Sequence, residues 1–134
     1  MKNCLFQLVF FGSLLAFSNG LNAQNGPKVY LESRKIDLDT LQTDTSYRIL
    51  VALKNIGDLP IRTLYIKNSG GCLYAYIGDR EPLFPEESRA IKINIDTKGR
   101  IGNQNKAFVI HSDDPEEPVI PVTCKFVIRA RKQR

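Results

Sequence analysis

Residues 47–54, with the sequence YRILVALK, decide the fold of this chain. Large apolar side chains recur at every second position, namely Tyr47, Ile49, Val51 and Leu53. A period of two is typical of a β-strand that buries one face. The run stops at residues 55–58, Asn-Ile-Gly-Asp, and Asn and Gly tolerate the positive φ angles of a tight reversal. We therefore predict a strand that ends in a tight turn.

The same alternation continues on both sides of this run, and no window shows apolar residues at helical spacing. The pattern slips by one residue near Thr63, where we predict a bulge. It breaks at the turn-forming segments 68–71, 78–87, 99–105 and 113–115. The predicted strands cover approximately residues 29–41 in two pieces, 47–54, 61–66, 73–77, 91–95, 106–112 and 120–128. About seven short strands indicate an all-β protein, an immunoglobulin-like antiparallel β-sandwich.

The first residues have the composition of a secretory signal peptide. Lys2 precedes an apolar stretch over residues 4–17, which is shorter than the roughly 20 residues that span a membrane. We predict a signal peptide over residues 1–23 with cleavage near Ala23, although Gly20 also suits the cleavage rule. Cys4 precedes the apolar stretch, whereas a lipid-anchored cysteine would follow it. Residues 24–134 are then a single exported domain, periplasmic or extracellular, soluble and without a transmembrane segment.

The positive charge is concentrated at the C-terminal end. The chain has a formal net charge of +5, and removal of the leader takes away one cation, Lys2. The remaining excess equals four cations in a short basic tail, residues 129–134: Arg129, Arg131, Lys132 and Arg134. A basic face with interleaved aromatic residues is absent, so no nucleic-acid partner is expected. The tail could make weak contact with an anionic surface, and salt would weaken that contact.

Five short motifs resemble, in order and spacing, a known family. They are Asn-Ile-Gly-Asp-Leu-Pro-Ile at 55–61, Ser-Gly-Gly-Cys at 69–72, Phe-Pro-Glu-Glu at 84–87, Asp-Thr-Lys-Gly-Arg at 96–100 and Ser-Asp-Asp-Pro at 112–115. Over residues 29–128 the chain is similar to a domain-of-unknown-function family of secreted bacterial immunoglobulin-like modules, related in architecture to pilus-chaperone and sperm-protein-like sandwiches. The resemblance implies the fold and export, and no particular activity.

The chain departs from the family pattern at its cysteines. The family pattern is Ser-Cys-Gly-Cys-Thr, but Gly70 and Leu73 replace its first cysteine and its threonine, and Glu86 stands where the family has glycine. Only Cys72 remains of the vicinal pair. A role that needs paired thiols, such as soft-metal binding, is therefore not carried over.

Two cysteines remain after removal of the leader, Cys72 and Cys124. An oxidising compartment favours disulfides. In an immunoglobulin-like strand order, however, the strand before Cys72 and the last strand flank a common neighbour. Two strand spacings give a separation of about 10 Å, beyond the roughly 7 Å limit for a bridge. We predict no disulfide, a buried Cys124 and a Cys72 that is either an accessible thiol or a packed one.

Catalytic and metal-binding signatures are missing from the sequence. There is no Gly-x-Ser-x-Gly, no glycine-rich phosphate loop and no Cys-x-x-Cys. His111 is the single histidine, and it falls on the opposite face of its strand from Phe108 and Ile110. Carboxylates that could bind Ca²⁺ are equally explained by strands and turns: Asp37, Asp39, Asp113, Asp114, Glu116 and Glu117. We expect no enzyme, no cofactor and no metal site, with Cys72 as a weak metal candidate.

The remaining hypotheses concern binding. The favoured one is a non-enzymatic module of the cell envelope that interacts with another protein or has a structural role, through an exposed sheet edge. The alternatives are a metal- or redox-linked carrier that uses Cys72 and a glycan-binding module that uses tyrosines, to which Tyr65 could contribute. The possible interaction surface comprises Tyr74, Tyr76, Arg129, Arg131, Lys132 and Arg134. The envelope partner itself is not identified by the sequence.

Overall fold

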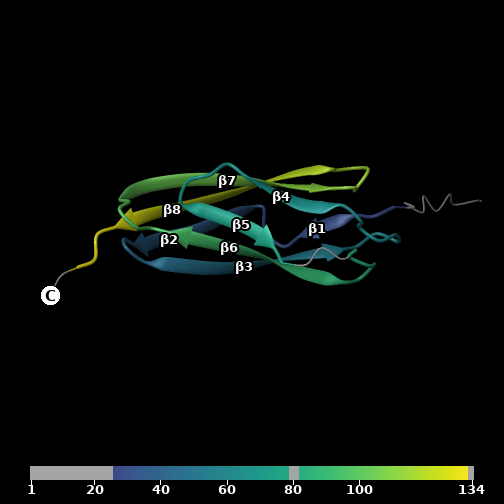
Figure 1. The fold of residues 1–134 in the computed structure, drawn as a ribbon, viewed down its shortest axis with the longest axis horizontal. Coiled ribbons are helices and arrows are strands. Elements are labelled where there is room, and N and C mark those ends of the chain that lie inside the picture. Colours follow the sequence, from purple (N-terminus) through teal and green to yellow (C-terminus); the bar gives the residue numbers. More distant parts are fainter. Residues whose placement is uncertain (1–25, 79–81, 133–134) are drawn as a thin grey trace, which may run out of the picture.

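The chain folds into two four-stranded β-sheets packed face to face, seen edge-on in Figure 1. This computed structural model describes residues 26–78 and 82–132, and no helix occurs among them. The strands are β1 (Val29–Leu31), β2 (Lys35–Gln42), β3 (Ser46–Asn55), β4 (Leu64–Asn68), β5 (Leu73–Ile77), β6 (Ser88–Asp96), β7 (Gly102–Ser112) and β8 (Val119–Arg129). The predicted all-β sandwich is confirmed, with eight strands because the first predicted run divides into β1 and β2.

The first sheet, sheet A, has the order β1-β3-β6-β5, and the second, sheet B, has the order β2-β8-β7-β4. The period of two in the sequence explains the core between them, because alternate residues of paired strands point to the same face. Val51 of β3 lies opposite Ile91 of β6, and Ile110 of β7 lies opposite Ile120 of β8. All four side chains are buried in one hydrophobic cluster. The core thus follows from the alternation alone.

One strand pair is parallel in this otherwise antiparallel sandwich. β2 runs parallel to β8, and its register shifts between Asp37 and Thr40. Asp39 has a φ of 59° at this irregularity. The physical reason is that the chain crosses from sheet A to sheet B between β1 and β2, so β2 reaches β8 without a hairpin.

The turn after β3 is not the tight reversal that the Asn-Gly pair predicts. β3 and β4 belong to different sheets, and Gly57 is not among the residues with positive φ. Glycine is required there by close approach instead, since a Cβ atom at Gly57 would lie 2.2 Å from the carbonyl oxygen of Gly26. Asn55 is fully buried, and its side-chain oxygen accepts the Gly57 N–H at 2.9 Å. Residues 55–58 therefore hold residues 26–28 against the end of the sandwich through close backbone contacts.

Three predicted boundaries shift. β7 begins at Gly102, so most of the segment predicted as a connection at 99–105 is strand. The predicted slip near Thr63 is a break in the strand at residues 62–63, between an isolated bridge at Ile61 and the start of β4. β8 includes Arg129, which pairs with Gln42, so the basic segment begins inside the last strand.

The predicted signal peptide, residues 1–23, lies outside the residues that the structure describes. Within the described ranges, 26–78 and 82–132, no helix is long and apolar enough to cross a membrane.

Candidate functional site

A groove runs between β4 and β5, the end strands of opposite sheets, which lie along the same side of the sandwich in Figure 1. Its volume is about 510 Å³. It is lined by residues of the two strands and of their approaches: Ile61, Arg62, Thr63, Leu64, Tyr65, Ile66, Tyr74, Ala75, Tyr76, Ile77 and Arg89. At this groove the two end strands are not covered by another strand, so some aliphatic side chains next to the core stay partly exposed.

The floor of the groove is apolar. Leu64 and Ile66 of β4 and Ile77 of β5 are half-buried and pack against the hydrophobic cluster, while Ala75 is buried. Full burial of an aliphatic side chain stabilises a protein by about 1.5–3 kcal/mol relative to exposure. Leu64, Ile66 and Ile77 obtain only part of that stabilisation in the free protein. An apolar group that covered them would complete their burial and so supply the rest.

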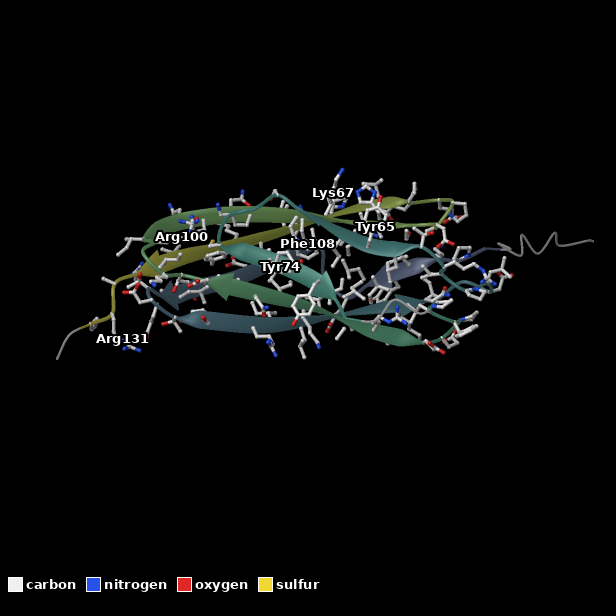
Figure 2. All side chains as sticks on the ribbon, in the orientation of Figure 1. Tyr65, Lys67, Tyr74, Arg100, Phe108 and Arg131 are labelled. Carbon is white, nitrogen blue, oxygen red and sulfur yellow. The ribbon has the colours of Figure 1, made fainter. Side chains whose placement is uncertain are left out.

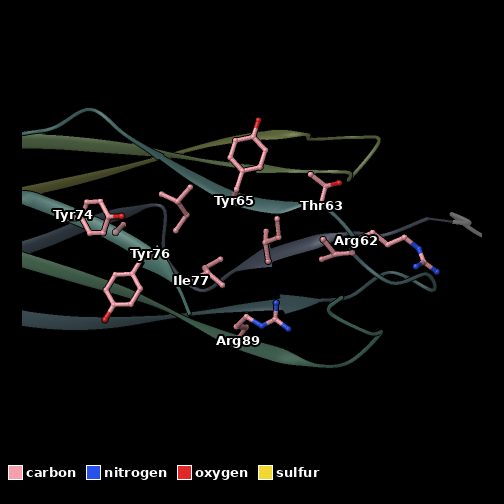
Figure 3. Close-up of a pocket in the computed structure, with 11 residues that line it drawn as sticks. Arg62, Thr63, Tyr65, Tyr74, Tyr76, Ile77 and Arg89 are labelled. Carbon is pink, nitrogen blue, oxygen red and sulfur yellow. The ribbon is translucent and has the colours of Figure 1, made fainter. Parts of the chain in front are cut away.

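Tyrosines form the two rims, as Figure 3 shows: Tyr65 projects from β4 on one side and Tyr76 from β5 on the other. Tyr74 is 59% exposed. The rings of Tyr74 and Tyr76 are 6.1 Å apart and tilted by 31°. The Lys92 ammonium lies 5.7 Å from the centre of the Tyr76 ring, within reach of a cation–π interaction. Tyr74 and Tyr76 therefore form a patch beside the groove.

Both ends of the groove are closed by reciprocal hydrogen bonds. At one end, the Ile61 N–H donates to the Leu83 carbonyl at 2.8 Å and the Leu83 N–H donates to the Ile61 carbonyl at 2.9 Å. At the other end, the Asn68 side-chain amide donates to the Ala75 carbonyl at 2.9 Å, and its oxygen accepts the Ala75 N–H at 2.8 Å. The opening is thus limited to the part of β4 between these two contacts.

His111 stacks on Tyr65, with ring centroids 4.7 Å apart and an interplanar angle of 3°. The two residues are cross-strand partners on β7 and β4. Phe108 and Ile110 are buried on the other face of β7, as predicted. This arrangement gives His111 a packing role on the outer face of sheet B.

The basic tail and the tyrosine patch do not meet. Figure 2 places Arg131 beyond the end of the sandwich and Tyr74 near its middle. Arg129, Arg131 and Lys132 are exposed, and Arg134 lies outside the described residues. The residues predicted as one interaction surface therefore occupy two separate places.

Cys72 and Cys124 are both buried and free, and β4 and β8 flank β7 as the predicted strand order requires. The pKa of the Cys124 thiol is raised to about 11. Burial is the main cause, and the nearby Cys72 and Asp37 add smaller electrostatic contributions. Cys72 is 7% exposed and lines a second hollow of about 470 Å³ together with Arg48 and Tyr74.

The acidic residues that the sequence singled out accept hydrogen bonds from the backbone. Asp37 accepts the Asp39 N–H at 2.9 Å, and Asp113 accepts the Arg62 N–H at 3.2 Å. Asp114 is buried and accepts N–H groups of Val29 and Glu116. In the described part of the chain, no three His, Cys, Asp or Glu side chains are grouped so that they could hold a metal ion.

Sequence reasoning missed Arg62, Leu64, Ile66 and Asn68 as site residues. The slip in alternation near Thr63 was a signal, because it marks the break between the Ile61 bridge and the start of β4. Asn68 was assigned to the turn-forming segment 68–71. Asparagine is depleted in strands, so its position at the end of an aliphatic strand was the available hint.

The sequence matches the family described as protein of unknown function, DUF1573, over residues 29–125. The chain belongs to the DUF1573 family. No curated protein matches it significantly. The specific motif pattern and the secreted character given in the sequence analysis are not part of this match.

Solved structures share the fold of this DUF1573 domain. A protein of unknown function from Porphyromonas gingivalis W83 has a TM-score of 0.67 and 21% identity, over 81% of this chain and 50% of that one. The ASH / PapD-like domain 7 of human CEP192 has a TM-score of 0.59 and 11% identity, over 78% of this chain and 87% of that one. A family 123 glycoside hydrolase from Clostridium perfringens has a TM-score of 0.60 and 8% identity, over 81% of this chain and 28% of that one. The chain spans half the length of the Porphyromonas protein, and at these identities the likeness concerns the fold alone.

Proposed function

We propose that residues 24–134 act outside the cytoplasm as a non-enzymatic module that binds a partner protein of the cell envelope. The observation that carries the proposal is the groove between β4 and β5. It combines half-buried aliphatic residues with tyrosine and arginine, the residue types that dominate the energetics of protein interfaces. The likeness to a PapD-like domain concerns the fold and is compatible with such a module.

Export rests on the composition of residues 1–23 and is tested separately. The protein is produced in its native host and its N-terminus is determined by mass spectrometry after fractionation. The proposal predicts a mature chain that starts at Gln24 in the periplasmic or extracellular fraction. A full-length cytoplasmic chain that retains Met1 contradicts it.

Binding is tested by photo-crosslinking in intact cells. A photoreactive phenylalanine analogue replaces Tyr74 at the groove and, as a matched control, Ile101, which is 63% exposed in the turn before β7. The proposal predicts a specific crosslinked protein from position 74 and none from position 101. Equal crosslinking from both positions, or none from position 74, contradicts a binding role for the groove.

A further inference from the structure

The backbone of β4 offers hydrogen-bonding groups to the groove, and the pattern of neighbouring bonds shows which ones. In an antiparallel pair, hydrogen-bonded and non-hydrogen-bonded residue pairs alternate. The Ser112 N–H donates to the Pro118 carbonyl at 2.9 Å, so even-numbered residues of β7 bond toward β8 and odd-numbered ones toward β4. The Ser69 hydroxyl donates to the Ala107 carbonyl at 2.7 Å, which confirms that this odd residue faces the β4 side.

Pro121 agrees with this assignment. It has no N–H, and it lies opposite Val109 in a pair that requires no bond between β7 and β8. Tyr65 and Lys67, the partners of His111 and Val109, are therefore the β4 residues that bond to β7. The N–H and C=O groups of Leu64 and Ile66 point the other way, into the groove.

The groove has the length of a short strand. The Ile61–Leu83 bonds close one end and the Asn68–Ala75 bonds close the other, and residues 62–67 lie between them. At about 3.3 Å per residue, this window is roughly 20 Å long. The Asn68 side chain also hydrogen-bonds to the N–H and C=O of Ala75 that point away from β6. The edge of β5 is blocked at this residue, so β4 is the strand that can pair with an incoming segment.

The side chains of the window favour an alternating pattern. Leu64 and Ile66 are two residues apart on β4, and together with Ala75 and Ile77 of β5 they form the apolar floor. A strand that pairs with β4 points every second side chain to this floor and the others to solvent. Aliphatic residues at alternate positions therefore fit the groove.

The charge at the Arg62 end of the groove favours an acidic residue in the bound segment. Arg62 lines one end of the groove and is exposed, and none of the described lining residues is Asp or Glu. The nearby Asp113 accepts the Arg62 backbone N–H. An acidic side chain at the Arg62 end of the segment would meet a cation there.

We infer that the groove binds an extended segment of a partner protein, with aliphatic residues at alternate positions and an acidic residue at the Arg62 end, as an added strand on β4. This inference rests on the proposed function and specifies the partner's chemistry. The occupant pairs with the outward groups of Leu64 and Ile66 and covers the half-buried aliphatic residues of the floor.

The test uses the full mature protein and three synthetic heptapeptides with blocked ends. The first is Asp-Val-Ser-Val-Thr-Val-Asp, which places an acidic residue at the Arg62 end in either strand direction. The second has the same composition with the valines made consecutive, and the third has Lys in place of both Asp residues. Binding is measured by titration while amide NMR shifts of the protein report the place of contact. We expect the first peptide to bind most tightly, with the largest shifts at residues 64–67.

Two variants separate backbone pairing from charge. Ile66→Pro removes an N–H that the β7 ladder does not use, and we expect about tenfold weaker binding of the first peptide, from one lost hydrogen bond and one lost aliphatic contact. Arg62→Glu should weaken the Asp peptide and strengthen the Lys peptide by about two- to fivefold each. Because Arg62 is exposed, this second variant stays informative even if the proline variant fails to fold.

Three results would overturn the inference: equal binding of the alternating and consecutive peptides, shifts outside the groove, or self-association of the protein through β4, which would make a second copy the occupant. If position 74 crosslinks to a partner while no peptide binds at β4, the proposed function stands and the strand inference fails. If neither occurs, both fail.

Discussion

Asn68 and Ala75 are joined by two hydrogen bonds, at 2.9 and 2.8 Å, in which one side-chain amide replaces a strand partner. The amide occupies both outward groups of Ala75 on the exposed edge of β5. Unpaired edges invite association with other chains, and proteins commonly protect them. Asn68 thus protects the edge of β5 and directs any incoming strand to β4.

Asn68→Ala should cost about 1–3 kcal/mol of the free energy of unfolding, because it leaves both groups of Ala75 without their partner. The control is Asn103→Ala on the exposed face of β7, which should change stability by less than about 0.5 kcal/mol. Chemical denaturation of the two variants and the wild type measures both effects. Equal stability of the two variants would show that the Asn68 contact contributes nothing.

Gly57→Ala should destabilise the protein by about 1–3 kcal/mol or more, since the added methyl would lie 2.2 Å from the Gly26 carbonyl oxygen and 2.6 Å from the Lys28 nitrogen. Gly78→Ala is the matched control, because its Cβ would meet only the end of the Lys92 side chain at 3.9 Å. Thermal melts compare the two. A Gly57→Ala variant as stable as Gly78→Ala would contradict the close approach at the N-terminal segment.

The raised pKa of Cys124 predicts a loss of stability at high pH. The folded thiol has a pKa of about 11 against an ordinary value of 9.0, so folding favours the protonated form. Its contribution is complete below pH 9 and decreases as the pH rises through 11, by about 2–3 kcal/mol in total. Denaturation curves at pH 8 and pH 11 measure it. Cys124→Ala should remove this part of the pH dependence, and an unchanged pH dependence would contradict it.

The ion pair of Arg34 and Glu117 predicts a small effect at low pH. The side-chain hydrogen bond from Arg34 lowers the pKa of Glu117, so the stabilisation is present above the ordinary value of 4.5 and is lost as the pH falls below it. Both side chains are more than a third exposed, and solvent screening limits the contribution to about 1 kcal/mol or less. Glu117→Gln should match the wild type at pH 2.5 and be slightly less stable at pH 7. A difference that persists at pH 2.5 would assign the effect to packing.

The strands could be predicted from the sequence because their signal is local. Each of the runs around Val51, Ile93 and Cys124 carries its own alternation, and the structure buries those residues as expected. The division of the first run into β1 and β2 is also confirmed. Burial of alternate residues needs no knowledge of which strands are neighbours.

The groove could not be predicted because it depends on contacts between distant segments. The parallel pairing of β2 with β8 follows from a crossing between sheets that periodicity does not encode. The Asn68–Ala75 bonds exist because the chain changes sheets between β4 and β5, and the sequence shows only a glycine-rich corner there. Gly57 was identified as special, but for a positive φ instead of a close approach.

The most direct test of the account is amide hydrogen exchange along β4, resolved by NMR in the mature protein. The account predicts slow exchange at Tyr65 and Lys67, whose N–H groups bond to β7, and fast exchange at Leu64 and Ile66, whose N–H groups face the groove. Addition of the alternating acidic peptide should slow exchange at Leu64 and Ile66 alone. Slow exchange at Leu64 and Ile66 in the free protein would contradict an open β4 edge and the strand-binding groove built on it.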